Sequence, residues 1–305
     1  MSLLDSAIVR LLPAVPKPVV QLFSSRYIAG ETLADAVAVV RDLNAGGKMA
    51  TVDVLGEEIT RAEETRAIAQ AYRDLFAAID KAALDSNVSV KLTALGLGLS
   101  YELCKENVLD VVRTATSYGN FVRIDMEDST TTDDTLRLYR ELREEGHDNV
   151  GVVLQARLKR TLDDVAALAD LQPSVRLCKG IYLERGAIAF TDFEAVRASF
   201  LRCLDALFDA GCYAGIATHD EWLIGESLAR VSRRGLGPLE YELQMLLGVR
   251  EERRDELVAE GHRLRVYVPY GEHWYAYSVR RLQENPQMAG TIARATAGRV
   301  LRLGR

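Results

Sequence analysis

The stretch NFVRIDMED, residues 120–128, is the part of the sequence that decides the fold, because apolar and charged side chains alternate along it. Successive side chains of a strand point to opposite faces of the sheet. One face therefore carries Val122, Ile124 and Met126, and the other carries Arg123, Asp125 and Glu127. The face that packs on helices must be the apolar one. The charged face then points into the interior of a closed sheet, where its groups must pair with one another or with a ligand.

Two earlier segments repeat this alternation. In VSVKLTA, Lys91 and Thr93 oppose apolar neighbours, and in ATVDV, Thr51 and Asp53 oppose valines. An interior this polar favours a site at the carboxyl ends of the strands, where barrel enzymes place their chemistry.

A regular rhythm of short β-branched runs and longer amphipathic stretches begins near residue 49. The predicted strands are 49–57, 88–96, 120–128, 149–157, 174–182, 213–221, 239–248 and 264–271. The predicted helices are 58–84, 101–117, 130–146, 159–170, 191–210, 221–235, 250–261 and 272–285. Eight such units predict an α/β fold, a closed (β/α)8 barrel of the TIM type. An open doubly wound sheet is the alternative, but LGEEITR follows the first strand without the glycine-rich turn typical of that fold.

Length and composition fit one large globular domain. The chain has 305 residues, of which 27% are charged and 48% hydrophobic. The net charge of −6 is not the basic footprint of a nucleic-acid binder, so no nucleic-acid partner is expected. Four cysteines without CxxC spacing favour a reducing, cytoplasmic compartment. No apolar run reaches the roughly 20 residues of a membrane span.

The N-terminal stretch places apolar residues at helical spacing but lacks a basic segment and a clean cleavage site, so it is not read as a signal peptide. The expected organisation is an N-terminal helical extension over 1–45 and a catalytic barrel over 46–305. The extension either docks on the barrel or makes a weak contact with a membrane surface.

Several polar residues near the predicted strand ends have both a structural and a functional interpretation. Lys91 is either the ionic partner of a buried aspartate or an amine donor to a substrate carboxylate. Arg176 and Lys179 either offset nearby carboxylates or hold an anionic cofactor, and Gly180 permits close approach of a flat ligand. His219 alone is more often structural than catalytic. No metal site is predicted, because HExxH and CxxC are both absent.

The last predicted helix, 272–285, carries a polar face. Tyr277, Arg280, Arg281 and Glu284 are spaced so that they share this face. Taken alone, the pattern is typical of a solvated helix. The helix directly follows the eighth strand, however, and adjacent arginines suit bidentate recognition of a carboxylate. Both interpretations stay open at this point.

A resemblance rests on segments that occur together and in order: VKLTALG, IDMED, VVLQA, VRLCKGIY, IATHD, LQMLLG, VYVPYG and Y..RRL.EN. With these, the chain from about residue 40 resembles the bacterial monofunctional proline dehydrogenases, flavoenzymes that also form one domain of the bifunctional PutA proteins. The resemblance implies a distorted barrel with FAD at the carboxyl ends of the strands. It also implies that the last helix lies over the barrel mouth.

Carried over position by position, the resemblance implies a role for each matching residue. The proline carboxylate would be held by the residues given the catalytic role: Lys91, Arg280 and Arg281. The walls around the proline ring would be Leu246, Tyr267 and Tyr277. The arginines would be held by Asp125 and Glu284. The FAD contacts would be Gln155, Arg176, Lys179, Gly180, Tyr182, Thr218 and His219.

The implied reaction is hydride transfer from L-proline to flavin N5, which gives Δ1-pyrroline-5-carboxylate in the first step of proline catabolism. A quinone would take the electrons onward, which implies a peripheral contact with the inner face of the membrane. Three alternatives stay open: another flavin barrel such as a methylenetetrahydrofolate reductase, a non-catalytic barrel that binds flavin or proline, and an aldolase-type barrel with Lys91 as Schiff-base amine.

Overall fold

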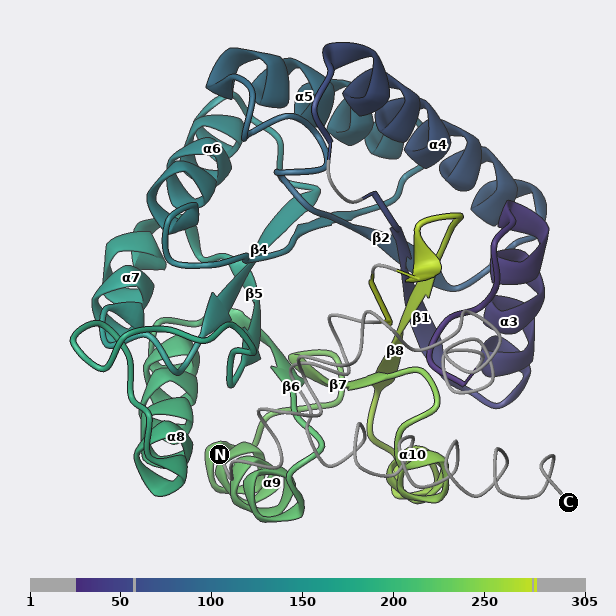
Figure 1. Ribbon diagram of the computed structural model, residues 1–305. Helices are drawn as coiled ribbons and strands as arrows, with labels where there is room; N and C mark the ends of the chain where they lie inside the picture. Colours follow the sequence, from purple (N-terminus) through teal and green to yellow (C-terminus); the bar gives the residue numbers. More distant parts are fainter. Residues whose placement is uncertain (1–25, 57–58, 276, 279–305) are drawn as a thin grey trace, which may run out of the picture.

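The computed structural model describes residues 26–56, 59–275 and 277–278, and within them the chain forms a closed parallel barrel (Figure 1). The strands follow one another around the barrel in sequence order. They are β1 (Met49–Val54), β2 (Ser86–Val90), β3 (Val122–Ile124), β4 (Val150–Gln155), β5 (Ser174–Cys178), β6 (Tyr213–Ala217), β7 (Tyr241–Leu246) and β8 (Leu264–Tyr270). Pairing of β1 with both β2 and β8 closes the sheet. The predicted (β/α)8 barrel is confirmed.

The described helices form an outer ring around the strands (Figure 1). They are α3 (Leu33–Ala45), α4 (Ala62–Lys81), α5 (Tyr101–Ser117), α6 (Thr132–Glu144), α7 (Thr161–Leu168), α8 (Phe193–Asp209), α9 (Glu221–Arg234) and α10 (Glu251–Ala259). A 3-10 turn, Ala169–Leu171, follows α7 and ends at Gln172, whose φ of 43° is left-handed. The helix predicted over 159–170 is therefore divided and shorter. The part of the chain that the structure describes contains no helix that could span a bilayer.

The alternation along the strands places apolar side chains outward and charged side chains inward, as the sequence predicts. Val52, Val88 and Ile124 are completely buried in the core between barrel and helices. Buried charged side chains fill the interior, and they bond across the barrel to other strands. Arg176 of β5, for example, donates to Ser89 of β2 at 3.0 Å. The interior is therefore a packed polar layer that leads up to the mouth.

The predicted strands extend too far at their carboxyl ends. β2 ends at Val90 and β3 ends at Ile124, so Lys91 and Asp125 lie just beyond the strands. The backbone turns at Lys91, whose carbonyl accepts a hydrogen bond from Leu95 N–H at 3.2 Å. The alternation of polar and apolar residues continues past the strand ends because the barrel mouth is polar. The sequence therefore does not show where each strand ends.

Helix α3 occupies the place in the outer ring between β8 and β1. It packs against both strands and against α4, and it lies between α4 and α10 in the ring (Figure 1). In a regular barrel the helix that follows the eighth strand takes this place. Because α3 fills it, the described residues after β8 lie elsewhere.

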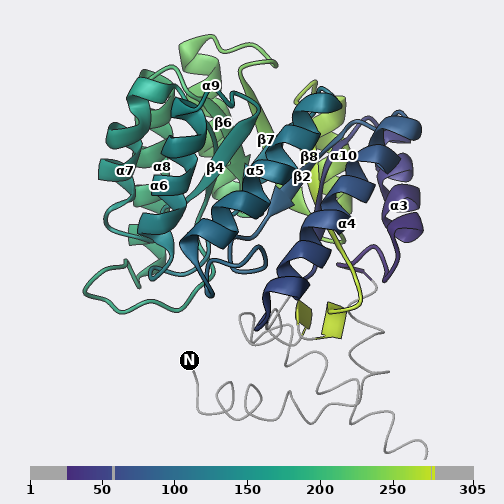
Figure 2. The same ribbon diagram turned by 90° about the horizontal axis from the view of Figure 1, so that it is seen from above.

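The described start of that last helix lies at the barrel mouth. Residues 274, 275, 277 and 278 are helical, and Figure 2 shows this yellow segment at the end of the barrel where α4 begins. Tyr277 lines the cavity there. Residues 272 and 273 form a turn, so the helix begins two residues later than predicted. Residues 276 and 279–285 of the predicted helix, and residues 1–25 of the predicted extension, lie outside the described residues.

Candidate active site

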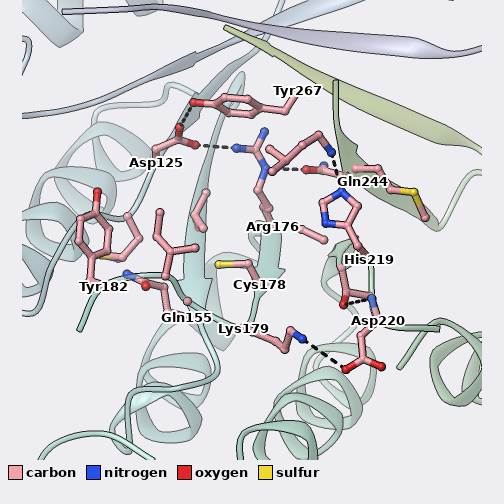
Figure 3. A pocket seen from close by; sticks show the side chains of 18 of the residues that line it. Asp125, Gln155, Arg176, Cys178, Lys179, Tyr182, His219, Asp220, Gln244 and Tyr267 are labelled. Carbon is pink, nitrogen blue, oxygen red and sulfur yellow. Dashed lines mark hydrogen bonds and ion pairs between the residues drawn. The ribbon is translucent and has the colours of Figure 1, made fainter. Parts of the chain in front are cut away.

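The carboxyl ends of the strands surround a cavity of about 710 Å³, a volume typical of small-molecule sites. Figure 3 shows its side chains converging from several strands and the loops that follow them. The cavity brings together the described residues that the sequence predicts for the site: Lys91, Asp125, Gln155, Arg176, Lys179, Gly180, Tyr182, Thr218, His219, Leu246, Tyr267 and Tyr277. Arg280, Arg281 and Glu284 lie outside the described residues.

The floor of the cavity is an ionic cluster around Tyr267 of β8. The ammonium of Lys91 pairs with the Asp53 carboxylate and donates to the Tyr267 hydroxyl at 3.1 Å. That hydroxyl lies 2.8 Å from Asp53 Oδ2 and 2.8 Å from Asp125 Oδ2. Its single proton can go to one carboxylate at a time, so the tyrosine bridges the two. The structural interpretation of Lys91 as a partner of Asp53 is thus correct, and a role toward substrate stays a prediction.

Arg176 continues this cluster deeper into the barrel. Its Nη1 donates to Asp125 Oδ1 at 2.6 Å, and its Nε donates to Gln244 Oε1 at 2.5 Å (Figure 3). Gln244 in turn donates to Glu242, which forms an ion pair with Arg265 at 2.7 Å. The described contacts of Asp125 therefore go to Arg176, Tyr267 and Lys91. Its predicted pairing with the arginines of the last helix involves residues beyond the described part.

The environment of Lys91 keeps its amine protonated. Burial disfavours the charge, but the carboxylates of Asp53 and Asp125 outweigh burial and raise the pKa of Lys91. A Schiff-base lysine needs the opposite shift, because the neutral amine is the nucleophile. The site is therefore poorly suited to the aldolase alternative. Burial and the same carboxylates raise the pKa of Tyr267, so its hydroxyl also stays protonated.

A second ionic cluster lies at the rim. Lys179 Nζ is 3.3 Å from Asp220 Oδ2, and Arg197 donates to the same carboxylate at 2.7 Å and 2.9 Å. The hydrogen bonds from Arg197, aided by the charge of Lys179, outweigh burial and lower the pKa of Asp220 to about 2. Arg197 also stacks over Phe193, 4.2 Å from the ring centroid. This cluster orders two cations beside the cavity.

His219 and Gly180 shape the walls between these clusters. His219 Nε2 accepts a hydrogen bond from Leu246 N–H at 2.9 Å, which ties the end of β6 to the end of β7. Gly180 has a φ of +95°, and a methyl group there would lie 2.7 Å from Gln155 Oε1. The Gln155 side chain donates to the Glu127 carbonyl at 2.6 Å. The absence of a side chain at residue 180 keeps this wall flat.

Sequence reasoning missed several lining residues, among them Phe193, Arg197, Asp220 and Gln244. A signal was available for Asp220, which follows the predicted contacts at 218 and 219 directly. Arg197 lies within the predicted helix over 191–210, and nothing in the sequence shows which residue across the mouth it pairs with. Among the described residues there is no group of three metal-ligating side chains that could hold an ion.

The geometry can be compared with known proteins. The proline dehydrogenase family model matches residues 36–294. The chain belongs to the proline dehydrogenase family. Proline dehydrogenase 1 of Bacillus subtilis (strain 168) is 38% identical over 272 residues, which cover 89% of this chain and 90% of that protein. Proline dehydrogenase of Deinococcus radiodurans is 38% identical over 273 residues, covering 88% of each.

Structures of larger relatives share the fold of this proline dehydrogenase family member. Proline utilization A (PutA) from Bdellovibrio bacteriovorus superimposes with a TM-score of 0.83 at 25% identity, over 92% of this chain and 36% of that one. PutA from Corynebacterium freiburgense, at 23% identity and a TM-score of 0.76, shows the same barrel. The enzyme class and the barrel are therefore established together, and the resemblance inferred from the sequence motifs is confirmed.

Proposed function

We propose that this family member oxidises L-proline to Δ1-pyrroline-5-carboxylate, with FAD as the hydride acceptor at N5. The observation that carries the proposal is the cavity itself, which joins the ionic floor around Tyr267 to the flat wall at Gly180. A small amino acid and a flat cofactor are the pair of ligands that these two surfaces fit.

The residues along the β4, β5 and β6 ends fit a flavin dinucleotide. Gly180 carries no side chain that could project into the cavity, and Gln155 packs directly against it, since a methyl group there would lie 2.7 Å from Gln155 Oε1. Lys179 keeps 31% of its side chain exposed beside Arg197, and cations of this kind suit phosphate oxygens. We propose that Gln155, Arg176, Lys179, Gly180, Tyr182, Thr218 and His219 hold FAD.

The opposite wall is proposed to hold the substrate. Leu246, Tyr267 and Tyr277 present apolar and aromatic surface to the proline ring, while Lys91, Arg280 and Arg281 take its carboxylate. Asp125 and Glu284 fix cations around it by ion pairing. Positioning of this kind lowers the barrier mainly through entropy. FAD, when bound, supplies the hydride acceptor.

The decisive test is anaerobic addition of L-proline to the purified full-length protein. We expect a yellow protein whose flavin absorbance bleaches with proline and not with NADH. Bleaching by NADH instead would indicate the reductase alternative, and a colourless protein that takes up no FAD would remove the enzymatic proposal. Because N-propargylglycine inactivated the PutA of Bdellovibrio bacteriovorus, we expect it to inactivate this protein as well.

The carboxylate clamp has its own test. Arg280→Met and Arg281→Met are each expected to raise the KM for proline by orders of magnitude while FAD stays bound, because each removes a bidentate donor. A wild-type KM in either variant would contradict the clamp.

We further propose a quinone as the electron acceptor and a cytoplasmic location, with a peripheral contact at the inner membrane face. Family membership supports the acceptor. Proline-dependent reduction of a soluble quinone, and co-sedimentation with anionic vesicles, test the two points separately. A protein that reduces the quinone and stays in the supernatant would refute only the membrane contact.

A further inference from the structure

A short segment before α3 runs along the rim of the barrel mouth, between the turn after β7 and the end of β8. We call residues 26–30 the strap. Its Ala29 N–H donates to the Pro269 carbonyl at 2.9 Å, and its Gly30 carbonyl accepts from Gly271 N–H at 3.0 Å. The strap is therefore bonded to the end of β8, immediately before the last helix begins.

Ile28 is the buried side chain of the strap, with 5% of its surface exposed. It packs with Leu55 and Tyr277 in a small apolar cluster, which the partly buried Trp274 covers. This cluster is separate from the main core between barrel and helices. The strap therefore packs against one side of Tyr277, which is 3% exposed.

Gly248 lets the strap pass close to the end of β7. Its φ is +71°, and a methyl group at this position would overlap the carbonyl of Arg26. Gly248 lies two residues after Leu246, which lines the cavity. The strap thus rests on the turn after β7 at Arg26 and on the end of β8 at Gly30, with Ile28 between them against Tyr277.

Tyr277 is the one member of the small cluster that lines the described cavity. It stands there with Lys91 and Tyr267, and no residue of the strap takes part in that lining. The position of a wall side chain depends on what packs behind it, since protein interiors are close-packed. Ile28 therefore touches the cavity only through Tyr277, the residue that it packs behind.

We propose that Ile28 is a positioning residue, and that the strap fixes Tyr277 in the substrate wall so that packing outside the cavity sets the affinity for proline. This inference rests on the proposed function, because proline is the ligand whose binding is measured. It assigns to the N-terminal part of the chain a role in substrate binding.

Ile28→Ala tests the proposal in the full-length enzyme. We expect the KM for proline to rise roughly tenfold to a hundredfold, with kcat at saturating proline nearly unchanged, and Ile28→Val to retain most of the wild-type KM. The matched control is Val40→Ala, which removes a buried aliphatic of α3 from the main core, where Val40 is 1% exposed. The control is expected to lower stability without changing the KM.

Fluorescence gives a readout that does not depend on turnover. The chain has two tryptophans, so a Trp222→Phe background leaves Trp274 as the reporter of the cluster. In this background we expect Ile28→Ala to shift the Trp274 emission to longer wavelength and increase its quenching by acrylamide. Val40→Ala is expected to do neither.

Gly248→Ala gives an independent test from the other end of the strap. Gly235→Ala is its control, because the φ of Gly235, +65°, is similar and a methyl group there would meet no atom within 4 Å. We expect only the Gly248 variant to raise the KM. Wild-type KM and wild-type Trp274 emission in Ile28→Ala would overturn the proposal, whereas absence of proline turnover in the wild type would refute the proposed function instead.

Discussion

Asp53→Asn should destabilise the barrel far more than an ordinary loss of an ion pair. Asp53 is completely buried, and its carboxylate pairs with Lys91 and lies 2.8 Å from the Tyr267 hydroxyl and 3.2 Å from the Tyr72 hydroxyl. Removing one partner of a buried pair costs about 3–5 kcal/mol, because the other charge remains buried. Lys91 keeps a second carboxylate, Asp125, at 3.9 Å, so the lower end of this range, about 3 kcal/mol, is expected.

The assay is urea and thermal unfolding of the variant and the wild type. At about 2 °C per kcal/mol for a large domain, the melting temperature should fall by about 6 °C. Asp209→Asn is the control, because Asp209 pairs with Arg234 while 70% of its side chain is exposed, and it should leave the unfolding midpoint unchanged.

The pKa of Lys91 is raised, so its contribution to stability is fully present below the unfolded pKa of about 10.4 and is lost only as pH rises above it.

The difference in unfolding free energy between the wild type and Asp53→Asn should therefore be constant from about pH 7 to pH 9. If Asp53→Asn lowered the unfolding free energy by less than about 1 kcal/mol, the reasoning would be refuted, because the Lys91–Asp53 pair would then behave like a solvated surface contact.

Two further predictions follow from titratable groups in the cavity. The pKa of Asp220 is lowered to about 2, chiefly by Arg197. A carboxylate with a depressed pKa stabilises the fold at pH values above its unfolded pKa. Asp220→Asn should therefore lower the free energy of unfolding by up to about 2 kcal/mol at pH 7. This cost should shrink as pH falls below about 4, and a cost independent of pH in urea unfolding would contradict the assignment. Burial raises the pKa of Cys178 to about 11, so iodoacetamide should modify this cavity thiol only slowly at about pH 8, where mass spectrometry of the labelled peptide reports it. Rapid labelling of the native protein would contradict this.

The barrel was predictable because its main signal is local. The alternation in NFVRIDMED fixes which side of the strand is apolar, and the eightfold rhythm fixes the closed sheet. The carboxyl ends of the strands were harder to predict, since Lys91 and Asp125 continue the same alternation after the backbone has left the strand.

Contacts between distant parts of the chain carry no such local signal. Helix α3 has the pattern of any amphipathic helix, and nothing in it indicates that it takes the place of the helix after β8. Ile28 reads as one apolar residue before a helix, although it packs behind Tyr277. Gln244 is an ordinary amide in a strand until its bond to Arg176 is seen. The motifs located the cavity, but the packing that supports it depends on pairs widely separated in sequence.

The charges on the described cavity floor balance one another. Lys91 and Arg176 face Asp53 and Asp125 within one connected cluster. The cations at the rim also form ion pairs, because Lys179 and Arg197 both contact Asp220. An amino acid that donates a hydride needs a neutral amine at that step, so its carboxylate then adds a net negative charge to this space.

An additional buried anion beside a balanced cluster would cost several kcal/mol unless a further cation accompanied it. The described part of the chain places no such extra cation on the cavity floor. The two guanidiniums predicted for the substrate carboxylate, Arg280 and Arg281, follow Tyr277 in the sequence and would supply that charge. Leu246, Tyr267 and Tyr277 would then fix the ring of the substrate, and the two arginines its carboxylate. On this reasoning the Arg280→Met and Arg281→Met variants lose proline affinity while the unfolding free energy of the barrel stays that of the wild type.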